Sequence, residues 1–105
     1  MTTFDKREEG FEKKFALDEE QRFKAESRRN RLLGLWVAEK LGMSGDAANA
    51  YAKEVVAAEF EAAGGVARKI TADLGAKGIA MSDAELGAKM HELMAQAAMQ
   101  VKAGT

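Results

Sequence analysis

The chain has 105 residues with 16 basic and 17 acidic side chains, one histidine and no cysteine. This length accommodates one hydrophobic core and leaves no room for a second domain. The balanced charge argues against a general binder of nucleic acid or anionic membranes, and the lack of cysteine excludes disulfides and thiolate metal sites. Without a secretion signal or an apolar run long enough to span a membrane, we expect a cytoplasmic protein that does not insert into membranes.

The composition predicts an all-α fold. Proline is absent, alanine is abundant, and β-branched residues never alternate with polar ones over the length of a strand. Glycines mark the turns between four helices, which we place at about Thr3–Leu41, Gly45–Ala63, Val66–Leu74 and Asp83–Lys102. The expected architecture is a single domain, a four-helix bundle over residues 21–105 preceded by a charged N-terminal segment, residues 1–20. The sequence leaves open whether the first helix is straight or broken near residues 18–21.

Apolar stripes predict which residues form the core. Ser82 and Glu85 have the spacing of a capping box at the start of the last helix. Helical spacing selects a stripe on the second helix and another on the fourth, made of Ala48, Tyr51, Val55, Ala58 and Ala62, and of Leu86, Met90, Leu93, Ala97 and Val101, the latter widened by Met94 and Met99. We interpret the methionine-rich stripe as core rather than as a binding groove. Trp36 is expected at the centre of the core.

The N-terminal segment has a different pattern. Phe4, Phe11 and Phe15 lie within about 40° on a helical wheel, while their neighbours are almost all charged. Acid-first pairs four residues apart would support this helix by a few tenths of a kcal/mol each: Glu9 with Lys13, Asp18 with Arg22, and Glu20 with Lys24. Such a stripe is too narrow for a core element. It fits either an arm that folds its phenylalanines onto the bundle or a helix that docks in a groove of a partner protein.

The sequence offers little for catalysis or metal binding. The one histidine, His91, begins the string His-Glu-Leu-Met-Ala, which has alanine where a zinc-protease motif needs its second histidine. Its charged neighbours predict a solvent-facing or boundary position. No nucleophilic triad, phosphate-binding glycine loop or metal site is encoded, and an enzyme is the least favoured class.

A cluster of basic residues could hold phosphate. Lys24, Arg28 and Arg31 fall within about 60° on the helix, with Arg22 and Arg29 on a second line. Guanidinium groups bind phosphate in a bidentate manner, although a solvated charged face has the same appearance. The interleaved glutamates and the lack of paired aromatic residues for base stacking argue against RNA binding.

Several of these motifs together resemble a known family. The run from Phe4 to Gly42 contains Phe-Glu-Lys-Lys-Phe at 11–15, Arg-Arg-Asn at 28–30 and Leu-Leu-Gly-Leu-Trp at 32–36. It is similar to the N-terminal signature of the zeta subunit of alphaproteobacterial F-type ATP synthases. The similarity continues through residues 50–55 and 82–86 and so covers nearly the whole chain. One departure is the neutral turn at 64–66, where the family is usually acidic.

The resemblance implies a four-helix bundle whose N-terminal segment inhibits ATP hydrolysis. The segment would insert at a catalytic interface between the α and β subunits of the F-type ATP synthase, near the γ subunit. The partner-binding residues would be Phe4, Arg7, Phe11, Lys13, Lys14 and Phe15. The protein would then lie in the cytoplasm at the soluble catalytic part of the membrane-bound enzyme.

The family is also described as binding ADP or ATP, with no cofactor required. On the phosphate argument above we assign a nucleotide to Arg28, Arg29 and Arg31. Two other hypotheses remain, a nucleotide-responsive sensor and a helical adaptor with no ATPase target. Only the inhibitor requires loss of hydrolysis when the protein is added to the ATPase, and only the sensor requires a response to ADP alone.

Overall fold

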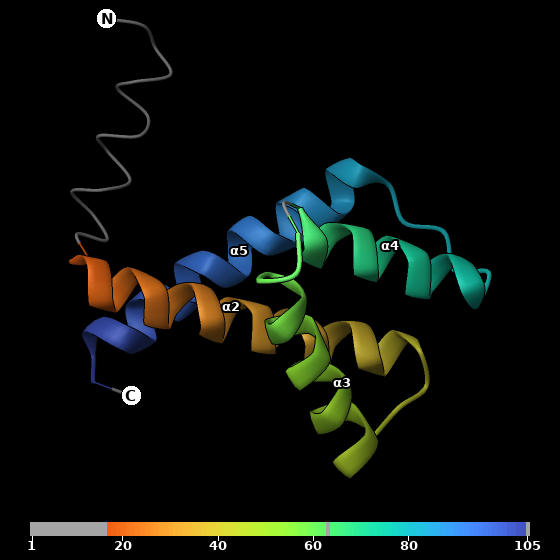
Figure 1. Cartoon of the computed structure of the whole chain (residues 1–105), viewed down its shortest axis with the longest axis horizontal. Helices are drawn as coiled ribbons and strands as arrows, with labels where there is room; N and C mark the ends of the chain where they lie inside the picture. The colour runs from red at the N-terminus through yellow and green to blue at the C-terminus, as the bar shows by residue number, and fades with distance from the viewer. Residues whose placement is uncertain (1–16, 63, 105) are drawn as a thin grey trace, which may run out of the picture.

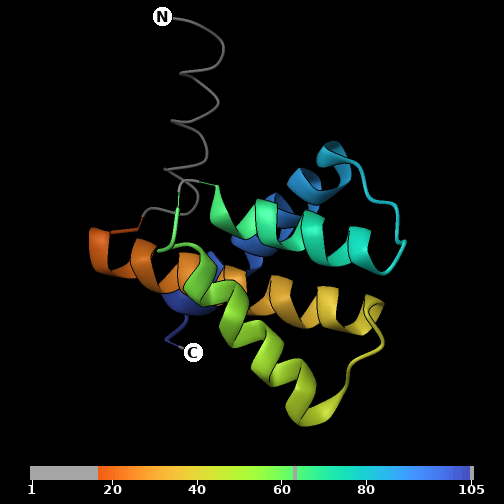
Figure 2. The same ribbon diagram turned by 45° about the vertical axis from the view of Figure 1, so that its right-hand side comes forward.

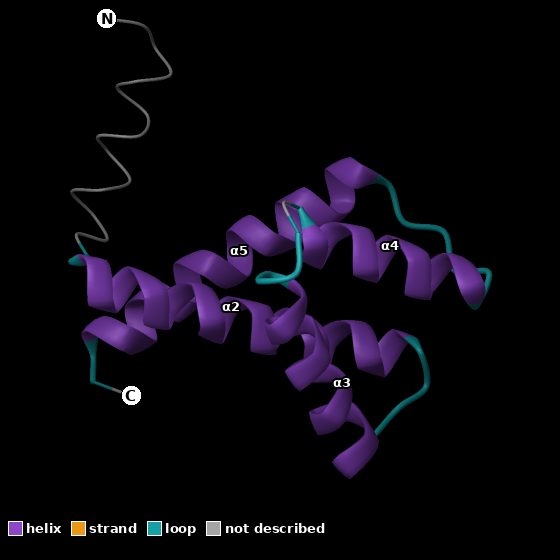
Figure 3. Cartoon of the chain, in the orientation of Figure 1, coloured by secondary structure: helices purple, strands orange, loops and turns teal. Residues whose placement is uncertain are grey.

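The computed structural model describes residues 17–62 and 64–104 of the chain. Within these ranges it contains four helices and no strand (Figure 3): α2 (Glu19–Lys40), α3 (Gly45–Ala58), α4 (Gly65–Ala76) and α5 (Asp83–Lys102). The prediction of an all-α fold is confirmed. None of the helices in the described part of the chain is long and apolar enough to cross a membrane.

Helix α2 is the common element of the packing. All three other helices contact it, α3 and α5 most extensively. Figure 1 shows α5 running beside α2 in the opposite direction, so that the end of α5 lies near the start of α2. Helix α3 crosses α2 on another side (Figure 2). Helix α4 has more contacts with α3 than with α2.

The start of α2 differs from the expected helix Thr3–Leu41. At Asp18 the backbone is extended, with φ −75° and ψ 176°, and the helix begins at Glu19. The Gln21 N–H donates to Asp18 Oδ1 over 2.7 Å, and the Asp18 N–H donates to Gln21 Oε1 over 3.2 Å. This reciprocal capping box sets the start of α2 at Glu19, and Asp18 caps the helix rather than pairing with Arg22. The expected Glu20–Lys24 pair is present at 3.5 Å.

Helix α3 ends at Ala58, five residues before the expected end at Ala63. Bonds from Phe60 N–H to Ala57 O and from Glu61 N–H to Ala58 O tighten the last turn, and the chain then doubles back. A Cβ at Gly65 would lie 2.1 Å from Ala58 O, so only glycine fits at the start of α4. In the neutral turn at residues 64–66, the lack of a side chain at Gly65 thus lets the chain pass close to Ala58.

The remaining boundaries are close to those expected. Helix α4 extends to Ala76 rather than Leu74, because Gly75 is helical and Gly78, with φ 70°, is the left-handed residue after the helix. Helix α5 has the predicted bounds. Ser82 Oγ accepts the Glu85 N–H over 3.1 Å and donates to Glu85 Oε1 over 3.2 Å, so the serine half of the predicted capping box is confirmed.

The core lies between α2 and the other three helices. Leu33, Val37, Val55 and Ile70 are fully buried, and Leu74, Leu86 and Leu93 are nearly so. The expectation for Trp36 is wrong: it lies at the edge of this cluster and is only partly buried. Its ring is covered instead by Lys40 Nζ at 4.6 Å and Lys89 Nζ at 5.1 Å from the centroid.

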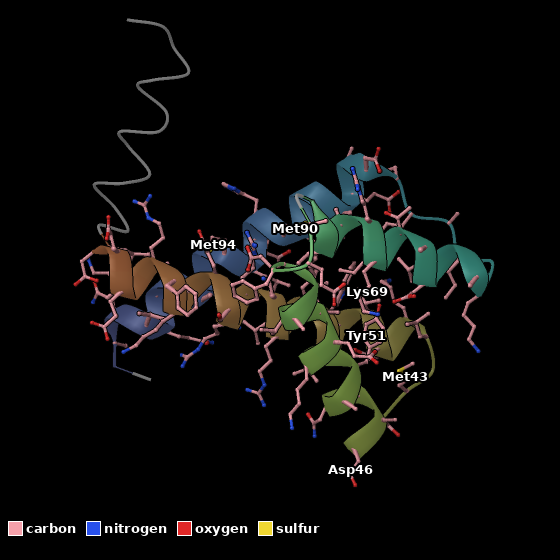
Figure 4. The ribbon with its side chains drawn as sticks, viewed as in Figure 1. Met43, Asp46, Tyr51, Lys69, Met90 and Met94 are labelled. Carbon is pink, nitrogen blue, oxygen red and sulfur yellow. The ribbon has the colours of Figure 1, made fainter. Side chains whose placement is uncertain are left out.

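The predicted stripes are buried or partly buried except at Ala62 and Met99. Tyr51, Val55 and Ala58 are buried on α3, and Leu86, Leu93 and Ala97 on α5. Met99, which was expected to widen the α5 stripe, is 62% exposed, and Ala62 is exposed because α3 ends before it. Met90 and Met94 lie on α5 (Figure 4), both partly buried.

Candidate functional site

The predicted partner-binding residues precede the first described residue. Phe4, Arg7, Phe11, Lys13, Lys14 and Phe15 all lie outside the described residues. The described part of the chain begins at Leu17, near the end of the N-terminal segment (residues 1–20), and Asp18 caps α2 there. The segment is therefore attached to α2, the helix that the other three contact.

Two of the three predicted phosphate-binding arginines lie together on α2. Arg28 and Arg31 border a hollow of about 390 Å³ with Leu32 and with Gln100 of α5. The Arg28 Nη1 donates to Gln100 Oε1 over 3.4 Å, which holds the guanidinium beside the end of α5. Arg31 is exposed. The hollow can offer two guanidinium groups and one amide to an anion.

The third arginine points elsewhere. Arg29 Nε donates to Asn30 Oδ1 over 3.1 Å, and Arg29 Nη2 lies 3.6 Å from Glu59 Oε1. Asn30 is fully buried and donates from Nδ2 to Glu59 Oε2 over 2.6 Å. The three side chains fasten α2 to the end of α3. A nucleotide held by Arg28 and Arg31 would therefore not reach Arg29 without breaking this network.

A second polar cluster joins α3 to α4. Tyr51 is 4% exposed, and its hydroxyl donates to Asp73 Oδ2 over 2.7 Å. Lys69 Nζ lies 3.1 Å from the same oxygen, 3.7 Å from Glu54 Oε2 and 5.1 Å from the centre of the Tyr51 ring (Figure 4). Burial, the hydrogen bond to Asp73, and the charges of Asp73 and Glu54 together raise the pKa of Tyr51.

Sequence reasoning missed both networks for the same reason. Tyr51 was recognised by its helical spacing, but Asp73 is 22 residues away, and Asn30 and Glu59 are 29 residues apart. Pairs at such separations follow from how the helices cross, which one sequence does not reveal. A polar residue, Asn30, in the middle of a helix that supplies the core was the available signal.

The described residues contain no group of three or more histidine, cysteine, aspartate or glutamate side chains able to hold a metal ion. His91 is exposed on α5, as its neighbours predicted. The N-terminal segment and the Arg28–Arg31 face stay predictions of where the protein acts.

Comparison with known proteins identifies the family of the chain. A protein whose structure was determined by solution NMR is 55% identical, and the match covers 79% of this chain and 96% of that chain, with a TM-score of 0.67. Comparison with curated proteins gives no match. The family model described as ATPase inhibitor subunit zeta matches residues 1–100. The match spans the N-terminal segment and all four helices, and the chain therefore belongs to this family of ATPase inhibitor subunits.

Proposed function

We propose that the protein inhibits ATP hydrolysis by the F-type ATP synthase by inserting its N-terminal segment, residues 1–20, at a catalytic interface between the α and β subunits near γ. The observation that carries this proposal is the family match over residues 1–100, because it includes the segment. The capped start of α2 supports the same division, since α2 has its own N-terminal cap at Asp18. The protein would act in the cytoplasm, at the soluble catalytic part of the enzyme.

The segment carries two kinds of contact group. Phe4, Phe11 and Phe15 form a narrow apolar stripe that a groove between two subunits would bury. Arg7, Lys13 and Lys14 would pair with carboxylates at the edge of that groove. The phenylalanines would supply most of the affinity, because charges at an interface rim contribute mainly to the rate of association.

The test is an ATP hydrolysis assay with the purified catalytic complex. The parent protein should reduce hydrolysis, and Phe11→Ala with Phe15→Ala should weaken inhibition at least about tenfold. Met99→Ala is the control, because it removes an exposed apolar side chain from α5. Unaltered hydrolysis in the presence of the parent protein would refute the proposal. Equal inhibition by the phenylalanine variant would refute the groove mechanism.

We propose in addition that ADP or ATP modulates this inhibition by binding at the Arg28–Arg31 face. The support is the hollow of about 390 Å³ between these residues and Gln100. Binding should be micromolar or weaker and should decrease with salt, because the hollow is shallow and its charges are screened.

An ADP titration followed by amide NMR tests the nucleotide site. Arg28→Ala with Arg31→Ala should lose the shifts that the parent shows. Arg68→Ala, which removes an exposed charge from α4, should keep them. Shifts in the double variant that equal those of the parent would place the nucleotide elsewhere, and a parent without shifts would leave the two arginines as a solvated face.

A further inference from the structure

Two large aromatic side chains are exposed together near the start of α2. Phe23 is 57% exposed and Phe60 is 65% exposed, and their ring centroids are 6.3 Å apart. Single exposed apolar residues are common on protein surfaces and need no explanation. A pair of phenylalanines in contact points more strongly to a binding surface, because both rings stay more than half exposed although they pack against each other.

The position of Phe23 explains its exposure. Phe23, Asn30 and Gly34 are separated by seven and four residues and so share one face of α2. Gly34 lies against Ala52 of α3, and Asn30 bonds to Glu59 just past the end of α3. Because α3 stops at Ala58, this face of α2 continues about two turns past the end of α3, and there the Phe60 ring contacts Phe23.

Each ring of the pair, which we call the Phe23–Phe60 ridge, borders a hollow of its own. One, of about 500 Å³, is bordered by Leu17 and Phe23. The other, of about 510 Å³, is bordered by Phe60 and Met90. A surface that received the ridge would also enter these hollows, and this is the shape of an anchor in an interface rather than of an isolated exposed side chain.

The ridge is adjacent to the N-terminal segment. Three residue steps separate Ala16 from Glu19, at most about 11 Å, and four helical steps of 1.5 Å lead on to Phe23. Phe23 is thus within about 17 Å of Ala16. An interface of ordinary size covers about 800 Å² on each partner, roughly 30 Å across. A partner protein that binds residues 1–16 of this chain would therefore also cover the ridge.

We propose that the Phe23–Phe60 ridge is a second docking contact, seated on the ATPase at the mouth of the interface that receives the N-terminal segment. This inference rests on the proposed function and adds a named contact from the helical bundle to it. The segment would supply the part that enters the interface, and the ridge would hold the bundle against its rim.

The charges around the ridge specify the receiving surface further. Glu19 and Glu26 border one hollow with Arg22, and Glu61 follows Phe60. Within residues 17–62 and 64–104, none of these three glutamates takes part in an ion pair. The fitting surface is an apolar depression with lysine or arginine side chains at its edge.

The experiment measures binding and inhibition for full-length variants on the purified catalytic complex. Phe23→Ala with Phe60→Ala should raise the Kd and the inhibitory concentration about tenfold or more, mainly through faster dissociation. Met99→Ala removes a comparably exposed side chain that borders neither hollow and should behave as the parent. Thermal unfolding of both should remain close to that of the parent, because the removed side chains are largely in water.

The phenylalanines of the segment separate the two proposals. If Phe11→Ala with Phe15→Ala weakens inhibition while the ridge variant inhibits as the parent does, the ridge proposal is overturned and the proposed function stands. A ridge variant that inhibits more strongly would show that the ridge covers the chain's own segment, and one that changes only self-association would show a contact between copies. Either result overturns the ridge proposal, whereas a parent protein that fails to inhibit refutes the proposed function itself.

Discussion

At Gly34 a missing side chain decides how closely two helices pack. An added Cβ would lie 2.6 Å from Ala52 Cα and 3.3 Å from Val55 Cβ, so α2 and α3 would have to separate. Gly34→Ala should therefore destabilise the protein by about 1–3 kcal/mol, although alanine favours helix. Gly87→Ala is the matched control, because this helical glycine of α5 faces open space, and it should stabilise by about 0.4–1 kcal/mol. Urea unfolding followed by Trp36 fluorescence measures both, and equal effects would contradict the close approach.

Tyr51 should make stability depend on alkaline pH. The folded protein raises the tyrosine pKa above its ordinary value of 10.0, chiefly by burial. The unfolded chain then loses the phenol proton above about pH 10 while the folded chain keeps it. The stability that the raised pKa of Tyr51 contributes is complete below about pH 10 and is lost as the pH rises further.

Tyr51→Phe isolates this effect, because the lysines titrate in both proteins. The variant should be less stable by about 0.5–1.5 kcal/mol at neutral pH, since the hydrogen bond to Asp73 is absent. Above pH 10 the two stabilities should converge. A constant difference from pH 7 to pH 11 in urea unfolding would show that the hydroxyl proton is not held by the fold.

Side-chain roles were predictable where they follow from spacing. Val55, Leu86 and Leu93 are buried as the apolar periodicity implied. Trp36 was misplaced because size and hydrophobicity do not distinguish the centre of a core from its edge, where an indole can lie beneath two lysine side chains. The Phe23–Phe60 pair was missed because its exposure depends on where α3 stops.

At the scale of one element, Asp18 defines where α2 begins. Asp18→Ala removes the Oδ1 acceptor for the Gln21 N–H, whereas the bond to Gln21 Oε1 can remain, because the backbone N–H of residue 18 donates it. The expected cost is about 0.5–2 kcal/mol, with faster hydrogen exchange of the amides of Gln21 and Arg22. Asp18→Asn should retain most of the stability, because asparagine caps as well as aspartate. An asparagine variant as unstable as the alanine variant would assign the effect to charge rather than to the cap.

Helix existence was easier to predict than helix ends. The bounds of α5 follow from Ser82 and from the apolar stripe after it. The end of α3 does not, because it depends on Gly65 fitting against the carbonyl of Ala58, a contact formed only when α4 folds back. The start of α2 could have been recognised from Asp18 and Gln21, whose spacing is that of a capping box.

For the whole molecule, residues 1–16 should be separable from the bundle. A chain beginning at Leu17 keeps the Asp18 cap, the buried residues of α2 and the contacts of all four helices. It should unfold cooperatively, with a melting temperature within a few degrees of the parent, and should no longer inhibit the ATPase. Circular dichroism and the hydrolysis assay provide the two measurements. Loss of cooperative unfolding would show that the segment supplies part of the core.

The pairing of α2 with both the next helix and the last one has a consequence for the order of folding. Asn30 and Glu59 are 29 residues apart, whereas Arg28 and Gln100 are 72 apart. Closing the longer loop costs more chain entropy, and the cost falls once α3 and α4 have formed and shortened it. We expect the α2–α3 hairpin to form first and α5 to add last. Core substitutions in α5 should therefore speed unfolding, whereas those at the α2–α3 contact should slow refolding.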